Sequence, residues 1–282
     1  MRIAWVTDST VSLDEELLQN DDVYTVPLQV LIEGQEYRDG IDITPAQMFS
    51  KMKLDGVLPT TSQPSVGTFL DLYSRLKVDY DCIISFHVSG ALSGTFSSSL
   101  QAAGMTDCSI FVIDTLILTY PMAVLIKKAM KMAAQGMMPV EIVDRINRIK
   151  ESNKTYVLIG SLEQLHRSGR MSGTSYYVGS ILNIKPIISI DKGKLSVKEK
   201  VRSRKKAKQR ILSYLEKDME IYDIQEIYIL FGLHEDESLL LKEELEAKFP
   251  SLKIETHPLG TTIGVHAGED TLGISWYNDN NL

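Results

Sequence analysis

The stretch "DCIISFHVSGALSGTF", Asp81 to Phe96, contains the pattern that decides the fold class. Its first half is a continuous apolar run, which is typical of a strand buried on both faces of a parallel sheet. A loop with Gly90 and Gly94 follows, and a helix is predicted from about Thr95. A strand that leads into a helix through a short loop is the repeating unit of a parallel α/β sheet.

Further units of the same kind flank this stretch. Their predicted strands lie at Arg2–Thr7, Ser109–Thr115 and Thr155–Ser161, and amphipathic helical segments separate them. Between them, "VYTVPLQVLIEGQEYRDG" reads as two extended runs around Glu33-Gly34, which is a hairpin signal. This alternation through roughly the first 160 residues predicts a parallel sheet with helices on both faces.

The second half has a different pattern. The segment "KPIISIDKGKLSVKEKV", Lys185 to Val201, predicts a hairpin that turns at Asp191–Gly193. A helix, the strand "EIYILFG", a second helix and late strands follow. We therefore expect an α/β protein of two domains, with residues 1–160 forming an N-terminal α/β domain that carries the hydroxyl-rich loops. Residues 161–282 are expected to form a C-terminal α/β domain with a mixed sheet and helices.

Composition excludes several classes of function. The chain has 282 residues and a net charge of −7, which disfavours general nucleic-acid binding. It contains no apolar run near the ~20 residues of a transmembrane helix and no signal-peptide pattern. Cys82 and Cys108 are the only cysteines, so a disulfide framework is not expected and a reducing cytoplasm is the predicted location.

Two loops are rich in hydroxyl groups and carry no lysine or arginine: "LPTTSQPSVGTF", Leu58 to Phe69, and "SGALSGTFSSSL", Ser89 to Leu100. A helix N-terminus offers free N–H groups and a partial positive charge, so it can hold an anion without a basic side chain. Thr61 and Ser93 can add hydroxyl donors. Plain helix capping, with Ser62 as a candidate cap, is the alternative explanation of the same residues.

Other chemistries have less support. The sequence contains no phosphate-binding glycine motif of the P-loop or dinucleotide type. Its five histidines include no H-x-x-x-H pair, so no metal site is predicted. An acyl ester hydrolase with Ser93 as nucleophile is an alternative, although the loop lacks G-x-S-x-G and no acid–histidine partner can be assigned.

Several motifs occur in an order that resembles the DegV family of bacterial fatty-acid-binding proteins. They are "VTDST", "VPLQVLIEGQEYRDGIDI", "TSQPS", "SGALSGTFSSS", "SGRMSG", "LNIKPIISIDKGKL" and "GVHAGEDTLG", and they span nearly the whole chain. The resemblance implies a two-domain protein with a long-chain fatty acid, such as palmitate, between the domains. It also implies a non-catalytic role without a cofactor, as the lipid-binding subunit of a bacterial fatty acid kinase. There a separate ATP-dependent protein phosphorylates the carboxylate.

The resemblance also assigns the head-group site in the hydroxyl loops. By motif, Thr61 and Ser93 are expected to contact the fatty acid carboxylate, and Ser62 and Gly94 to shape the same loops. Most of the affinity would then come from the tail, at about 0.8 kcal/mol per buried CH₂.

Two charged residues are implied near the head group or for presentation to the kinase. They are Arg170, in "SGRMSG", and His266, in "GVHAG". The end of the second motif departs from the glycine-proline-glycine character of the family, because "GEDT", with Glu269 and Asp270, stands there. These carboxylates place negative charge close to the expected anion.

A basic segment, "KEKVRSRKKAKQR", Lys198 to Arg210, stands out in an acidic chain. Ala207, Ile211 and Leu215 recur every four residues, so one helix face is expected to pack. The basic residues would then form either a solvated face, a docking patch for the kinase, or the sensing surface of a lipid-responsive regulatory module. The candidate docking residues are Arg202, Arg204, Lys205 and Lys206.

Overall fold

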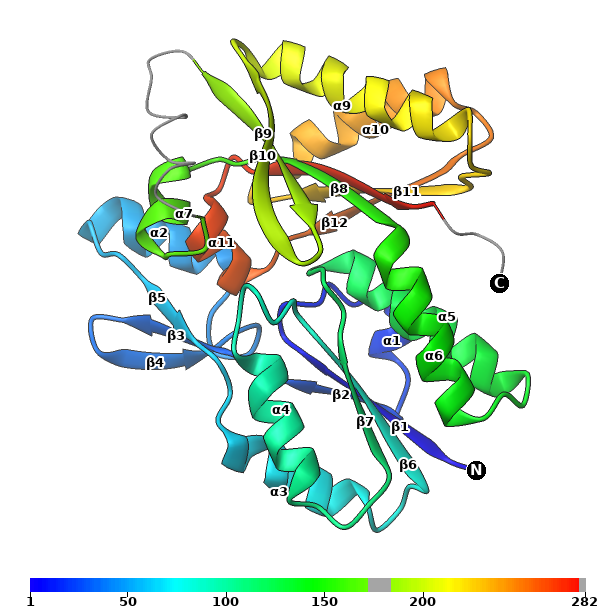
Figure 1. Ribbon diagram of the computed structural model, residues 1–282. Coiled ribbons are helices and arrows are strands. Elements are labelled where there is room, and N and C mark those ends of the chain that lie inside the picture. The colour runs from blue at the N-terminus through cyan, green and yellow to red at the C-terminus, as the bar shows by residue number, and fades with distance from the viewer. Residues whose placement is uncertain (172–183, 279–282) are drawn as a thin grey trace. The chain divides into compact units, whose positions relative to one another are not determined.

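Figure 1 shows the computed structural model of the protein, which describes residues 1–171 and 184–278. The chain divides into two compact units. Unit 1 comprises Met1–Glu151 together with Gly260–Thr262, and unit 2 comprises Ser152–Leu259 and the residues from Ile263 onward. Each unit is described by itself.

Unit 1 contains a parallel sheet of four strands in the order β2-β1-β6-β7. Each neighbouring pair is parallel. All six residues of β1 and all six of β6 are buried, as the continuous apolar runs predict. The strands are β1 (Ile3–Asp8), β2 (Val23–Val26), β6 (Cys82–His87) and β7 (Ile110–Asp114).

Helices cover both faces of this sheet (Figure 1). The pair α3 (Val66–Leu76) and α4 (Thr95–Gly104) packs on one face, and the pair α5 (Tyr120–Ala134) and α6 (Pro139–Ile149) packs on the other. The short helix α1 (Glu15–Leu18) follows β1. The fold class predicted for the first half is therefore confirmed.

A small antiparallel sheet in unit 1 has the strand order β4-β3-β5. Its strands are β3 (Gln29–Ile32), β4 (Gln35–Arg38) and β5 (Thr60–Ser62), and α2 (Pro45–Asp55) lies between β4 and β5 in the chain. The predicted hairpin is present, since Glu33 and Gly34 have φ angles of 52° and 82°. Two successive positive φ values are the requirement of a type I′ turn.

Unit 2 contains a mixed sheet in the order β10-β9-β8-β13-β11-β12, in which only β11 and β12 pair in parallel. The strand predicted at Thr155–Ser161 belongs to this sheet, not to the parallel sheet of unit 1. It spans Asn153–Leu158 and pairs with β13 and β9. The strands are β8 (Asn153–Leu158), β9 (Lys185–Asp191), β10 (Lys194–Val201), β11 (Glu226–Phe231), β12 (Lys253–Pro258) and β13 (Leu272–Tyr277).

The helices α9 (Arg204–Met219) and α10 (Glu235–Lys248) supply much of the core of unit 2. The predicted apolar face of the basic helix is confirmed, because Ala207, Ile211 and Leu215 are buried in this core. The remaining helical elements are η1 (Lys150–Ser152), α7 (Leu162–Arg167) and α11 (Thr261–Ala267).

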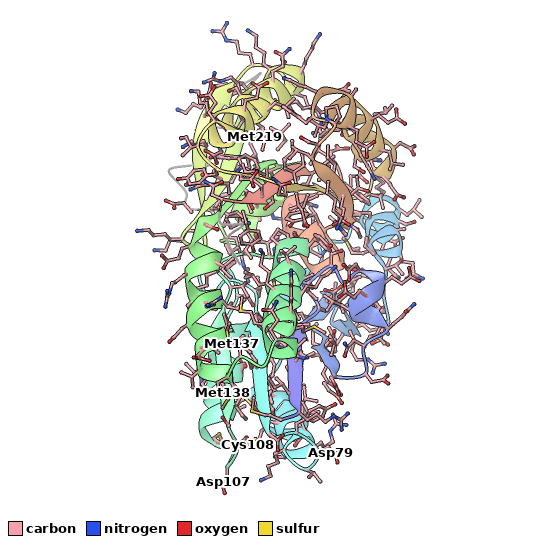
Figure 2. All side chains as sticks on the ribbon, turned by 90° about the vertical axis from the view of Figure 1, so that its right-hand side faces the viewer. Asp79, Asp107, Cys108, Met137, Met138 and Met219 are labelled. Carbon is pink, nitrogen blue, oxygen red and sulfur yellow. The ribbon has the colours of Figure 1, made fainter. Side chains whose placement is uncertain are left out.

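Both cysteines are free. Cys82 is buried at the start of β6, and Cys108 lies just before β7, beside Asp107 (Figure 2). Among the described residues, no helix has the length and apolar character needed to cross a membrane.

Candidate ligand site

The first hydroxyl loop connects β5 to α3. Thr61 lies in β5 opposite Val30, so the small antiparallel sheet fixes its backbone. The Ser62 hydroxyl donates to the Gln63 carbonyl at 3.2 Å and does not cap the helix. Ser65 is the cap instead, since its hydroxyl accepts a hydrogen bond from the Thr68 N–H at 3.1 Å. The capping explanation therefore applies to Ser65 and not to Ser62.

The second hydroxyl loop connects β6 to α4. The cap position of α4 is Gly94, which has no side chain to offer. The Ser93 hydroxyl lies 2.9 Å from the Thr95 hydroxyl and accepts from the Thr95 N–H at 3.3 Å. Ser93 is partly exposed, whereas Thr95 is buried. A partly exposed hydroxyl at the start of a helix is suited to an anionic group.

The structure brings the two hydroxyl loops into contact within unit 1. The Gln63 side chain lies against Gly94, where an added Cβ would stand 1.8 Å from the Gln63 Oε1 atom. Gln63 Nε2 also donates to the Ser98 hydroxyl in α4 at 3.0 Å. Sequence reasoning missed Gln63, although it stands inside the "TSQPS" motif between Ser62 and Pro64. A side chain at position 94 would have to displace the Gln63 amide.

Unit 2 brings Arg170 and His266 together. Burial of the His266 imidazole, together with the positive charge of Arg170, lowers the pKa of this histidine to about 4. His266 is therefore neutral near pH 7, and each neutral imidazole has one N–H donor and one acceptor nitrogen. The Arg170 guanidinium donates to the Ser168 carbonyl. Of these two residues, only Arg170 carries a formal charge at neutral pH.

The acidic pair that departs from the family motif follows α11. Its backbone is tightly packed, because the Glu269 carbonyl accepts from the Leu233 N–H at 2.8 Å. The Asp270 carboxylate lies 3.0 Å from His234 Nε2, and its side chain is 61% exposed. The charge of Asp270 is thus directed toward His234 and solvent.

The basic segment does not present all four predicted docking cations equally. Arg204 forks onto Glu237, with Arg204 Nε 2.9 Å from Oε1, and this ion pair contributes to lowering the pKa of Glu237 to about 2. The pair lines a cavity of about 360 Å³ in unit 2. Arg202, Lys205 and Lys206 are exposed. Arg204 is therefore committed to an internal ion pair, and the other three cations face solvent.

The hydrolase alternative needs a histidine beside Ser93. His87, the histidine nearest to Ser93 in the sequence, contacts Ser85 and Asp8 instead, and all three of these side chains are buried.

Among the described residues, no group of three or more histidine, cysteine, aspartate or glutamate side chains is arranged to hold a metal ion.

Fold and site together define a class: a two-unit α/β protein in which one hydroxyl loop follows β5 of the small antiparallel sheet and adjoins a second that follows β6 of the parallel sheet. The chain belongs to the DegV family, whose model, described as "Uncharacterised protein, DegV family", matches residues 2–279. Protein DegV of Bacillus subtilis is 34% identical over 278 residues, which cover 98% of this chain and 99% of that protein. The family resemblance drawn from the motifs is confirmed.

Two solved structures extend the comparison to three dimensions. A DegV family protein from Thermus thermophilus, described by its fatty acid binding, has a TM-score of 0.91 and 31% identity. DegV from Bacillus subtilis, described as a fatty acid binding protein, has a TM-score of 0.90 and 33% identity. Each similarity covers 99% of this chain and 100% of the other, so the whole fold is shared.

Proposed function

We propose that this protein binds a long-chain fatty acid in the bacterial cytoplasm and presents its carboxylate to a separate ATP-dependent kinase. In that role it is a non-catalytic lipid-binding subunit. The observation that carries the proposal is the contact between the two hydroxyl loops through Gln63 and Gly94. The descriptions of the Thermus and Bacillus structures as fatty acid binding support the same ligand.

The head-group chemistry suits a carrier. A monocarboxylate has one diffuse negative charge, and the Thr61 and Ser93 hydroxyls are neutral donors. A hydrogen bond from a neutral hydroxyl to a charged group contributes about 1.5–3 kcal/mol. Such donors orient the carboxylate and still allow it to leave. The tail then supplies most of the affinity, at about 0.8 kcal/mol per buried CH₂.

We assign Arg170 and His266 to the transfer step. The kinase would move the terminal phosphoryl group of ATP onto a carboxylate oxygen, which releases ADP and leaves an acyl phosphate. The planar fork of Arg170 matches phosphate oxygens. Because the pKa of His266 lies at about 4, its neutral imidazole can donate one hydrogen bond without adding charge.

The kinase would dock on the exposed cations of the basic segment, Arg202, Lys205 and Lys206. Exposed rim charges act mainly by steering encounter, which suits a partner that must bind and release repeatedly. Arg204 would stabilise this end of α9 through its ion pair with Glu237 in α10.

The experiment that tests the proposal is lipid extraction from the purified protein, followed by mass spectrometry. We expect about one long-chain fatty acid per chain, and exchange with added palmitate or oleate. Repeated extraction without stoichiometric lipid, together with no binding of either added fatty acid, would falsify it. Binding of lipid without acyl phosphate formation by a purified fatty acid kinase would restrict the function to binding.

A further inference from the structure

Five polar side chains form a continuous buried hydrogen-bond chain in unit 1. Asp8 Oδ2 lies 3.1 Å from His87 Nδ1, and His87 Nε2 lies 2.7 Å from the Ser85 hydroxyl. The Tyr73 hydroxyl donates to Ser85 at 2.9 Å and lies 2.6 Å from the Ser99 hydroxyl. All five residues have an exposed fraction of 0%. We call these residues the buried chain.

One assignment of donors and acceptors satisfies the whole buried chain. Because Tyr73 donates to Ser85, the proton of Ser85 can go to His87 Nε2. His87 then carries its proton on Nδ1 and donates it to the Asp8 carboxylate. Ser99 in turn donates to the Tyr73 oxygen. Every buried proton has an acceptor in this arrangement, so all five side chains are satisfied.

The buried chain contacts the second hydroxyl loop at its beginning and the helix that follows this loop. At one end, Asp8 Oδ2 also accepts from the N–H of Val88, the first residue of the loop, at 2.9 Å. At the other end, Ser99 lies in α4, five residues after the cap position at Gly94. The segment from Val88 to Ser99 is thus held at its beginning and at its end by one set of side chains.

Asp8 also holds the loop that follows β1. Its Oδ1 atom accepts from the Thr10 N–H at 3.1 Å and from the Thr10 hydroxyl at 2.6 Å. The carboxylate therefore uses both oxygens, each with two donors. An asparagine cannot make the same hydrogen bonds, because its NH₂ group would face one of these two pairs of donors.

We propose that Asp8 and His87 are positioning residues for Ser93: the buried chain sets where the Ser93 hydroxyl stands at the start of α4. They do not touch the ligand. The link to fatty acid affinity rests on the proposed function, whereas the effect on the loop does not. The middle of the loop has further anchors, Ser89 N–H to the Ile117 carbonyl and Gly90 N–H to Asp114, so loss of the chain should loosen the loop without unfolding it.

Two substitutions of His87 separate the halves of the buried chain. In His87→Asn the amide N–H can occupy the position of Nδ1 and keep the bond to Asp8. In His87→Gln the amide reaches the position of Nε2, so it keeps the hydrogen bond to Ser85 and loses the hydrogen bond to Asp8. Thr155→Val is the control, because it breaks a buried hydroxyl pair of unit 2, Thr155 to Ser275 at 2.7 Å. It should lower the stability of the protein and leave unchanged both the hydrogen exchange of the Val88–Ser93 amides and the affinity for palmitate.

The first readout is hydrogen exchange of the backbone amides from Val88 to Ser93 in ligand-free protein. We expect exchange to be about tenfold faster in His87→Gln, which equals about 1.4 kcal/mol of local opening, and changed by less than about threefold in His87→Asn. The second readout is palmitate affinity, which should fall about tenfold in His87→Gln and keep near wild-type values in His87→Asn. Asp8→Asn should behave like His87→Gln in both.

If the His87 variants do not fold, Tyr73→Phe tests the other end, since it keeps the ring and removes only the hydroxyl. It should speed exchange of the Ser93 and Thr95 amides while the Val88 amide keeps its protection. Equal exchange in wild type and both His87 variants, or equal loosening in Thr155→Val, would overturn the positioning role. Faster exchange in His87→Gln with a wild type that binds no palmitate would support the positioning role and refute the proposed function.

Discussion

Gln63 lies so close to Gly94 that a Cβ atom at position 94 would stand 1.8 Å from the Gln63 Oε1 atom. Gly94 has φ of −76°, which any residue can adopt, so the contact with Gln63, and not the backbone conformation, disfavours a larger residue at this position. The two residues come from different hydroxyl loops, and their contact is the point at which these loops meet.

The first prediction concerns this contact. Gly94→Ala should displace the Gln63 side chain and break its bond to Ser98, at a cost of about 1–2 kcal/mol in unfolding free energy. In a Gln63→Ala background the same change should cost clearly less, because the obstructing group is gone. Urea unfolding of the four proteins of this double-mutant cycle measures the coupling. Additive changes in unfolding free energy would show that positions 63 and 94 do not interact.

A second prediction addresses the carboxylate donors. Thr61→Ala and Ser93→Ala should each weaken palmitate binding by about 0.5–1.5 kcal/mol, or up to about 3 kcal/mol if the donor meets the full carboxylate charge. The double variant should show coupling, since both donors would share one anion. Ser65→Ala is the matched control, because it removes the cap of α3 and should lower stability but not affinity. Wild-type isotherms for both Thr61→Ala and Ser93→Ala would refute the assignment.

A third prediction follows from the pKa of His266, which burial and then the charge of Arg170 lower to about 4. An unfolded histidine binds a proton near pH 6.5, whereas the folded one remains neutral until about pH 4. The contribution of His266 is therefore present above pH 6.5 and is lost as pH falls toward 4, by up to about 3 kcal/mol. Denaturant unfolding between pH 7 and pH 4.5 should show a flatter profile for His266→Gln. Parallel pH profiles of unfolding free energy for wild type and His266→Gln would contradict this role of His266.

The fourth prediction separates binding from transfer. Arg170→Lys keeps the charge but removes the planar fork, so acyl phosphate formation by a fatty acid kinase should fall about tenfold or more while palmitate affinity changes little. His266→Gln keeps an N–H donor and should retain more activity than His266→Ala. Equal losses of affinity and of product formation would make both residues ordinary ligand contacts.

The fifth prediction concerns docking. Arg202→Glu combined with Lys205→Glu should slow association with the kinase, most strongly at low salt, because the screening length falls to about 8 Å near physiological ionic strength. Lys217→Glu, an exposed charge near the other end of α9, is the control. Arg204→Ala should instead lower stability, since Glu237 loses its main partner. Surface plasmon resonance with immobilised kinase measures the rates, and an unchanged association rate at low salt would identify a solvated helix face.

The sequence by itself determined the elements that depend on local pattern. Buried parallel strands such as Cys82–His87 require unbroken apolar runs, and the turn at Glu33-Gly34 requires residues that accept positive φ. The repeat of Ala207, Ile211 and Leu215 likewise reports which helix face is buried. Each of these depends on neighbours within a few residues, so the order of amino acids suffices. The family motifs, among them "TSQPS" and "SGALSGTFSSS", predict a fatty acid as the class of ligand.

Only the tertiary structure decided which distant groups meet. Periodicity shows that Asn153–Leu158 is a strand, but its pairing with β13, more than a hundred residues later, assigns it to the second sheet. The bond of Gln63 to Ser98 and the ion pair of Arg204 with Glu237 have the same origin. So does the bond between His87 and Asp8. A side chain's propensity is local, whereas its partner depends on how the chain returns in space. Burial then turns that partner into a requirement, because a buried donor or acceptor must be satisfied.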